Sequence, residues 1–114
     1  MASKYRSRSV EVDGIRFDSK KEASYYKIYK MQLDSGQIKS LELQPKYELI
    51  PRHRRRGKAV RSMNYYADFE IEHLDGRIEI IDVKASASYK TEVYRMKKKI
   101  FEYLYPDKEI VEVY

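Results

Sequence analysis

Apolar and polar residues alternate along most of this chain, and in two segments the apolar residues recur at helical spacing instead. The first alternating segment is short, because its apolar residues flank the pair Asp13-Gly14, which predicts a small hairpin or an extended entry. These apolar residues are Val10, Val12, Ile15 and Phe17. A basic lead-in over residues 1–9 precedes them, and we expect it to be mobile.

The residues from Ser19 to about Ser35 predict a helix. They are good helix formers, Ser19 and Glu22 have the spacing of a capping box, and Gly36 follows as a stop. One face of this helix would carry residues at intervals of four, three and four, namely Glu22, Tyr26, Tyr29 and Leu33. A carboxylate is therefore expected in line with three large side chains.

Strand patterns follow in the middle of the chain. Residues 38–50 alternate but are interrupted by Gln44 and Pro45, which predicts one bent strand or two short ones. Residues 65–72 have the period of two that is typical of a half-buried strand. Residues 78–85 are nearly all apolar, as expected for a central strand covered on both faces. The exceptions in this last segment are Glu79, Asp82 and Lys84.

A second helix is predicted from Thr91 to Leu104, with Pro106 marking the exit. Its repeating apolar residues are Val93, Met96, Ile100 and Leu104. A last strand is expected at residues 110–113. The order of helix, strands, helix and strand predicts an α/β fold with a mixed central sheet flanked by helices, in a single domain over residues 1–114.

The composition limits the classes of function. The 114 residues include 24 Lys and Arg against 18 Asp and Glu, and the formal net charge of +6 favours nucleic acid as a polyanionic partner. No apolar run approaches the roughly 20 residues that a membrane span needs, so we expect no membrane partner and a cytoplasmic location. The chain has no cysteine and two histidines, so any metal ion would be held by oxygen atoms.

The strongest charge cluster lies in residues 52–62, which we interpret as a solvent loop because its like charges repel one another. Its cations are Arg52, Arg54, Arg55, Arg56, Lys58 and Arg61. Charge runs often serve only solubility. The density of cations here favours contact with nucleic acid phosphates instead.

Asp82 and Lys84 are candidates for chemistry. A strand sends residues two apart to the same face, so the carboxylate and the ammonium would project side by side, next to Ile80. Charged groups beside apolar ones are costly unless they are paired or bind a metal ion. A simple ion pair at the end of the strand also explains the two residues, because a D-x-K match is common by accident.

Asp68 strengthens the case for a site only if it lies on the same face as Asp82, and the turn between their strands decides this. A two-residue turn at Asp75-Gly76 would place Asp68 opposite Val83 and separate the carboxylates. A three-residue loop with Gly76 in the left-handed conformation would place Asp68 directly opposite Asp82. The sequence allows both registers. The second creates a like-charge pair that needs a cation between its members, and this geometry suits Mg²⁺.

In such a site a divalent ion would polarise the scissile phosphate and activate a water molecule, while Lys84 would steady the nucleophile or the phosphate. Glu22 would add a carboxylate if the first helix packs on the sheet. The capping box with Ser19 explains Glu22 equally well.

Three further features have both a functional and a structural explanation. Lys97 lies on the apolar stripe of the second helix, so it either reaches toward the phosphate or extends past its neighbours into solvent. Lys98 belongs to a basic helix face that is typical of solvent exposure and can also touch a DNA backbone. Exposed tyrosines are candidates for stacking on bases, namely Tyr65, Tyr89 and Tyr94.

Together these segments resemble the PD-(D/E)XK nuclease superfamily, which implies a restriction-endonuclease-like αβββαβ core. Within it the chain is most similar to a phage-borne family of small nucleases related to Holliday-junction resolvases, long described as a domain of unknown function. The matching segments are residues 13–19, 44–46, 66–69, 82–84 and 91–101. Ala85 departs from the Gly that follows the lysine in many members, and Ala67 from the superfamily's Pro.

The resemblance implies a metal-dependent endonuclease that hydrolyses DNA, on branched or structured DNA such as Holliday junctions, during phage recombination or replication in the cytoplasm of a bacterial host cell. By this resemblance Mg²⁺, or Mn²⁺ in its place, would be held by Glu22, Asp68, Asp82 and the backbone carbonyl of Val83. Lys84 would be the catalytic lysine, and Lys97 a further catalytic residue. A homodimer is expected by analogy. The alternative is a catalytically inactive DNA- or RNA-binding module on the same fold.

Overall fold

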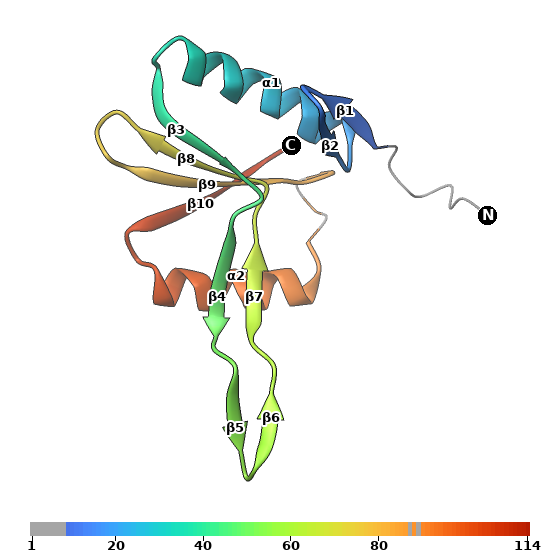
Figure 1. Cartoon of the computed structure of the whole chain (residues 1–114), viewed down its shortest axis with the longest axis vertical. Coiled ribbons are helices and arrows are strands. Elements are labelled where there is room, and N and C mark those ends of the chain that lie inside the picture. The colour runs from blue at the N-terminus through green and yellow to red at the C-terminus, as the bar shows by residue number, and fades with distance from the viewer. Residues whose placement is uncertain (1–8, 87, 89) are drawn as a thin grey trace, which may run out of the picture.

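The computed structural model describes residues 9–86, 88 and 90–114. A four-stranded sheet in the order β10-β9-β8-β3 forms its centre, with helix α1 on one side and α2 on the other (Figure 1). The strands are β3 (Ile38–Leu43), β8 (Phe69–His73), β9 (Ile78–Val83) and β10 (Lys108–Val113). Neighbouring strands are antiparallel except for β9 and β10, which are parallel. The predicted mixed α/β architecture is therefore confirmed.

The N-terminal hairpin and the first helix form where the sequence predicts them. Strands β1 (Val10–Val12) and β2 (Ile15–Phe17) are joined by Asp13 and Gly14, whose φ angles of 55° and 75° are those of a tight left-handed turn. Helix α1 (Lys20–Asp34) begins after Ser19. Apart from Ser9, the basic lead-in predicted to be mobile lies outside the described residues.

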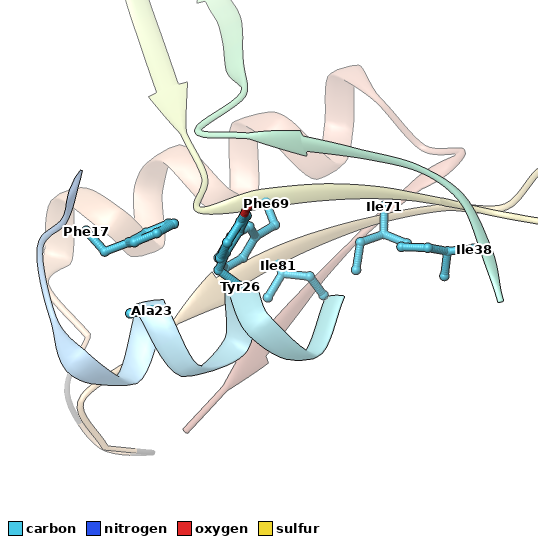
Figure 2. Packing of buried hydrophobic residues seen from close by; sticks show 7 residues of the cluster. All are labelled: Phe17, Ala23, Tyr26, Ile38, Phe69, Ile71 and Ile81. Carbon is cyan, nitrogen blue, oxygen red and sulfur yellow. The ribbon is translucent and has the colours of Figure 1, made fainter. Parts of the chain in front are cut away.

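Helix α1 covers one face of the sheet through a core of seven buried residues (Figure 2). They are Phe17, Ala23, Tyr26, Ile38, Phe69, Ile71 and Ile81. Tyr29 packs edge-on against the fully buried Phe69, with ring centres 5.3 Å apart, and Leu33 also packs against this cluster. The helix face predicted from the spacing of Tyr26, Tyr29 and Leu33 is therefore the face that packs on the sheet.

Helix α2 (Glu92–Leu104) also lies where it is predicted, but of its four repeating apolar residues only Ile100 packs against the core. Val93 and Met96 are 61% and 57% exposed, whereas Phe101 is fully buried. Phe101 packs edge-on or tilted against aromatic rings from the neighbouring strands and from the end of the helix, namely Tyr47, Tyr65 and Tyr105. Aromatic rings bury more surface than Val or Met and prefer such tilted contacts, so they determine which side of the helix packs inward. No helix in the described part of the chain is both long and apolar enough to cross a membrane.

A two-stranded ribbon leaves the sheet beside α2 and projects from the body of the protein (Figure 1). Near the body β4 (Lys46–Ile50) pairs with β7 (Met63–Tyr66), and at the far end β5 (His53–Arg55) pairs with β6 (Lys58–Val60). The chain bends at two places where the ribbon meets the sheet: Gln44, with a φ angle of 48°, and the segment Ala67–Asp68.

The prediction of a solvent loop at residues 52–62 is wrong, because residues 53–60 form an antiparallel hairpin. Arg56 and Gly57 have φ angles of 52° and 77°, as a two-residue hairpin turn requires. The backbone groups pair across this turn while the cationic side chains extend into water, so the repulsion that suggested a loop is screened by solvent. We refer to β5, β6 and the flanking Arg52 and Arg61 as the basic hairpin.

The turn between β8 and β9 has the three-residue form. Gly76 has a φ angle of 89°, the Gly76 N–H donates to the carbonyl of His73, and the His73 N–H donates to the carbonyl of Arg77. Phe69 consequently pairs with Ile81. Of the two registers that the sequence allows, this is the one that brings Asp68 to the side of Asp82.

Candidate active site

Asp82 and Lys84 project from the end of β9 toward α2. Asp82 is only 7% exposed, and its Oδ1 lies 2.9 Å from Nζ of Lys84. Tyr65 donates a 2.6 Å hydrogen bond to the other carboxylate oxygen, Oδ2. The predicted shared face is confirmed. The ion pair that offers a purely structural explanation is present as well.

Lys84 also rests on an aromatic ring. Its Nζ lies 3.2 Å from the centre of the Tyr94 ring, and the Tyr94 hydroxyl donates a 2.6 Å hydrogen bond to Oε2 of Glu112. Lys90 and Lys98 reach the same Glu112 carboxylate, at 2.8 and 3.4 Å. Burial alone would raise the pKa of Glu112, but its bonds to Lys90 and Tyr94 lower the pKa to about 2. A charged network therefore holds the Tyr94 ring beneath Lys84.

Asp68 occupies the bend between β7 and β8. Its N–H donates to the carbonyl of Ile81 at 3.0 Å, and its Oδ2 accepts a 2.7 Å hydrogen bond from the N–H of Val83. These two bonds place Asp68 alongside Asp82. The pKa of Asp68 is raised to about 6. Burial has the largest effect and the charge of Asp82 adds to it, while the hydrogen bond from the Val83 N–H acts in the lowering direction.

Glu22 approaches the same region from the first turn of α1. Its side chain is 5% exposed, and its Oε1 has no hydrogen-bond partner in the described part of the chain. Burial, followed by the charges of Asp68 and Asp18, raises its pKa to about 7, and Asp82 adds a smaller effect in the same direction. The amide of Gln44 opposes this shift. The carboxyl group of Glu22 is therefore electrostatically coupled to both other acids.

The capping box explains only half of the position of Glu22. Ser19 does cap the helix, because its Oγ accepts a 3.1 Å hydrogen bond from the Glu22 N–H. The reciprocal bond from the Ser19 N–H to the Glu22 carboxylate is not formed among the described residues. The carboxylate instead lies near Asp68.

A pocket of about 260 Å³ opens where the ribbon meets the sheet. Its lining residues are Asp18, Gln44, Tyr66, Ala67 and Asp68. A water molecule takes up about 30 Å³ of liquid, so several fit beside the Asp68 carboxylate. Of the three acids, Asp68 is thus accessible to solvent from this side.

Sequence reasoning missed several residues that build this region. Lys21 donates from Nζ to the carbonyls of Lys84 and Ala85, at 3.3 and 3.1 Å, and so ties the start of α1 to the end of β9. Tyr65, considered for base stacking, is 3% exposed and is instead a partner of Asp82. Tyr94 is half-buried beneath Lys84, and Tyr89 lies outside the described residues. No local pattern marks these long-range contacts.

No ion pair among the described residues joins the other predicted residues to the three acids. Lys97 is half-buried on α2 and forms no ion pair within the described part of the chain. Lys98 forms an ion pair with Glu112. The cations of the basic hairpin are exposed: Arg52, Arg54, Arg55, Arg56, Lys58 and Arg61.

The three acids match a metal site in their chemistry but not in their arrangement. Within residues 9–86, 88 and 90–114, no group of three or more His, Cys, Asp or Glu side chains is arranged so that it could hold a metal ion. Asp82 and Asp68 turn their oxygens toward Tyr65, Lys84 and the Val83 N–H instead. The donors nevertheless fit a hard divalent cation chemically, because all are oxygens, Glu22 has a buried oxygen without a partner among the described residues, and two of the acids have raised pKa values.

Comparison with known proteins assigns the chain to a family. No curated protein and no solved structure matches it. Residues 2–113 match the family described as protein of unknown function (DUF1064), and the chain belongs to this family.

Proposed function

We propose that this protein is a metal-dependent endonuclease that hydrolyses DNA phosphodiester bonds. The observation that carries the proposal is the coupling of three acids from different elements, Glu22, Asp68 and Asp82, beside the ammonium group of Lys84. Buried like charges raise the free energy of the folded state. Such a cluster therefore needs a functional explanation, and a bound divalent cation relieves this cost.

The topology supports the resemblance to the PD-(D/E)XK superfamily. Around the central sheet the elements follow the order α1, β3, β8, β9, α2, β10, which corresponds to the αβββαβ arrangement of a restriction-endonuclease-like core. Asp82 and Val83 end the third of these strands, and Lys84 directly follows it. Asp68 directly precedes the strand before it, β8.

The chemistry divides between the cation and the protein. When bound, Mg²⁺ or Mn²⁺ supplies positive charge that polarises the scissile phosphate and favours deprotonation of the attacking water. Asp68 and Asp82 would hold it, with Glu22 and the Val83 carbonyl as further oxygen donors. Lys84, fixed by Asp82 and by the Tyr94 ring, would orient the phosphate or the nucleophile in the correct geometry. Lys97 is proposed as a further catalytic residue on the resemblance alone.

The basic hairpin supports DNA as the substrate. Its exposed cations would contact phosphates, and Lys98 on α2 is a weaker candidate because it also pairs with Glu112. The preference for branched DNA such as Holliday junctions, the role in phage recombination or replication within a bacterial cytoplasm, and the homodimer are proposed from the family resemblance.

A second candidate is a catalytically inactive DNA- or RNA-binding module on the same fold. The observation that favours it is that the acids turn toward protein donors and do not form a ready metal-holding group in the described part of the chain. The substitutions Ala67 and Ala85 relative to the superfamily and family patterns point the same way.

Cleavage of junction, flap and linear DNA with Mg²⁺ or Mn²⁺ separates these candidates. The proteins compared are the wild type, Asp82→Ala, Lys84→Ala and the matched control Asp75→Ala, which removes an exposed acid from the β8–β9 turn. If the protein is a nuclease, Asp82→Ala and Lys84→Ala should abolish cutting and retain DNA binding. Equal faint cutting by all four proteins would indicate contamination and favour the binding module.

A further inference from the structure

The basic hairpin carries cations on both of its faces and at its tip. Residues paired across an antiparallel hairpin point to the same face, so Arg55 and Lys58 share one face. Arg54 pairs with Ala59 on the opposite face, and continuing this register by one pair beyond His53 and Val60 adds Arg52 and Arg61 there. Arg56 lies in the turn.

Nothing in the hairpin offsets this charge. The sequence from residue 49 to residue 67 contains no Asp or Glu. Positions 51–59 are exposed throughout, so these side chains do not serve a core. One of the cations, Arg54, also donates to the Gly57 carbonyl at 3.1 Å, which braces the turn.

This distribution of charge selects among anionic partners. A ribbon lying flat on a charged surface would use only one face, whereas a ribbon inserted into a groove meets phosphates on both sides. The major groove of B-form DNA, about 12 Å wide, admits a two-stranded ribbon, while the major groove of duplex RNA is too narrow. A lipid surface would call for large apolar side chains, and β5 and β6 supply only Ala59 and Val60.

We propose that the basic hairpin inserts into the major groove of a DNA duplex and contacts the phosphates of both strands. This inference rests on the proposed function for its substrate and adds a requirement to it. Residues 58–67 lead from the tip back to Asp68, which corresponds to roughly 30 to 35 Å at 3.3 Å per residue. That length is about one helical turn of B-DNA, or 10 base pairs. The substrate must therefore carry a B-form arm of about this length on one side of the cut.

The test measures binding without cleavage. Fluorescence anisotropy in a metal-chelating buffer compares a 20-base-pair DNA duplex with an RNA duplex of the same sequence, for the wild type and two face-specific double variants. One is Arg55→Gln with Lys58→Gln, and the other is Arg52→Gln with Arg61→Gln. The matched control, Lys27→Gln with Arg77→Gln, removes two exposed cations outside the hairpin.

Each hairpin double variant should weaken DNA binding about tenfold and reduce the slope of log K against log salt by about 2, since each lost phosphate contact contributes about 0.9. The control should change affinity less than about twofold on the same basis. Wild-type protein should bind the RNA duplex more weakly than the DNA duplex. Methylation of guanine N7, which lies in the major groove, should interfere with DNA binding.

Three results would overturn the inference: an effect from only one face of the hairpin, an equal affinity for RNA, or indifference to N7 methylation. These readouts do not depend on turnover. If the binding results come out as expected while no cutting is found, the groove-binding hairpin stands and the proposed nuclease activity fails. If wild-type protein cuts DNA while the binding results contradict the inference, the nuclease activity stands and the groove-binding hairpin fails.

Discussion

The hydroxyl of Tyr65 donates a 2.6 Å hydrogen bond to Oδ2 of Asp82, although the two residues belong to different sheets. Tyr65 lies on β7, in the ribbon, and Asp82 on β9, in the central sheet. Burial of the ring and the nearby charge of Asp82 both raise the pKa of Tyr65 well above its ordinary value. Tyr65 therefore stays protonated and continues to donate to Asp82.

Tyr65→Phe removes this donor without changing the shape of the ring. We expect a loss of about 2 kcal/mol in the free energy of unfolding, because a hydrogen bond to a buried carboxylate is lost. We also expect cleavage to fall about tenfold or more, as when residues that orient metal ligands are replaced.

Tyr47→Phe is the matched control for this change. Tyr47 belongs to the same cluster as Tyr65, but its hydroxyl donates a hydrogen bond to Glu70 and not to Asp82. Urea denaturation should show similar stability losses for both variants, and initial cleavage rates should differ. If Tyr65→Phe cuts as fast as Tyr47→Phe, Tyr65 has only a structural role.

Two substitutions of Tyr94 separate the effect of its ring on Lys84 from the effect of its hydrogen bond to Glu112. Tyr94→Phe keeps the ring and loses the bond, while Tyr94→Leu loses both. A contact between an ammonium group and an aromatic ring contributes about 0.5 to 2 kcal/mol, so we expect cleavage within about threefold of wild type for Phe and a decrease of about tenfold for Leu. The decrease should appear in kcat more than in KM. Equal rates for the two variants would show that the ring does not position Lys84.

The raised pKa values of Glu22 and Asp68 predict a stability that falls as the pH rises in metal-free buffer. Between the unfolded-state pKa near 4.5 and the folded-state pKa of about 7, the folded protein binds more protons through Glu22, so raising the pH through this window favours unfolding. Asp68 acts in the same direction between 3.8 and about 6. The two acids are coupled, and the combined loss should be about 3 kcal/mol.

Thermal unfolding between pH 4.5 and pH 8 measures this effect. Glu22→Gln should remove much of the slope, and Mg²⁺ should stabilise the wild type more at pH 8 than at pH 5. Glu112, whose pKa is about 2 in the folded protein, binds fewer protons there than in the unfolded chain near pH 4.5, so it opposes the slope only at the lower edge of this range. A wild-type stability that rises with pH across this window would contradict the proposed coupling.

The sequence predicts most elements of this fold because their boundaries depend on local signals. Ser19 and Thr91 cap the two helices, and glycines occupy the turns that need a positive φ angle. The register of β8 and β9 could not be decided in this way, because either of two turns satisfies Asp75-Gly76. The observed register goes with the packing of Phe69 and Ile71 in the core beneath α1, a long-range contact that leaves no local pattern.

The errors have a common physical origin. On α2 the repeating aliphatic residues Val93 and Met96 stay exposed, and an aromatic cluster around Phe101 determines which face packs inward. The basic hairpin was predicted as a loop because like charges repel. Its turn at Arg56-Gly57 and its backbone pairing outweigh this repulsion in water. The partners of the candidate site, Lys21 and Tyr65, come from distant parts of the chain and leave no local pattern.

Titration with Mn²⁺, followed by electron paramagnetic resonance, tests the central claim most directly, since it requires neither a DNA substrate nor turnover. We expect a site in the wild type whose affinity falls about tenfold or more in Asp68→Asn and in Asp82→Asn, because each change removes an anionic oxygen donor. The control Asp75→Asn, on the exposed β8–β9 turn, should bind as the wild type does. Equal Mn²⁺ affinity in all four proteins would contradict the claim that these acids converge on a divalent cation.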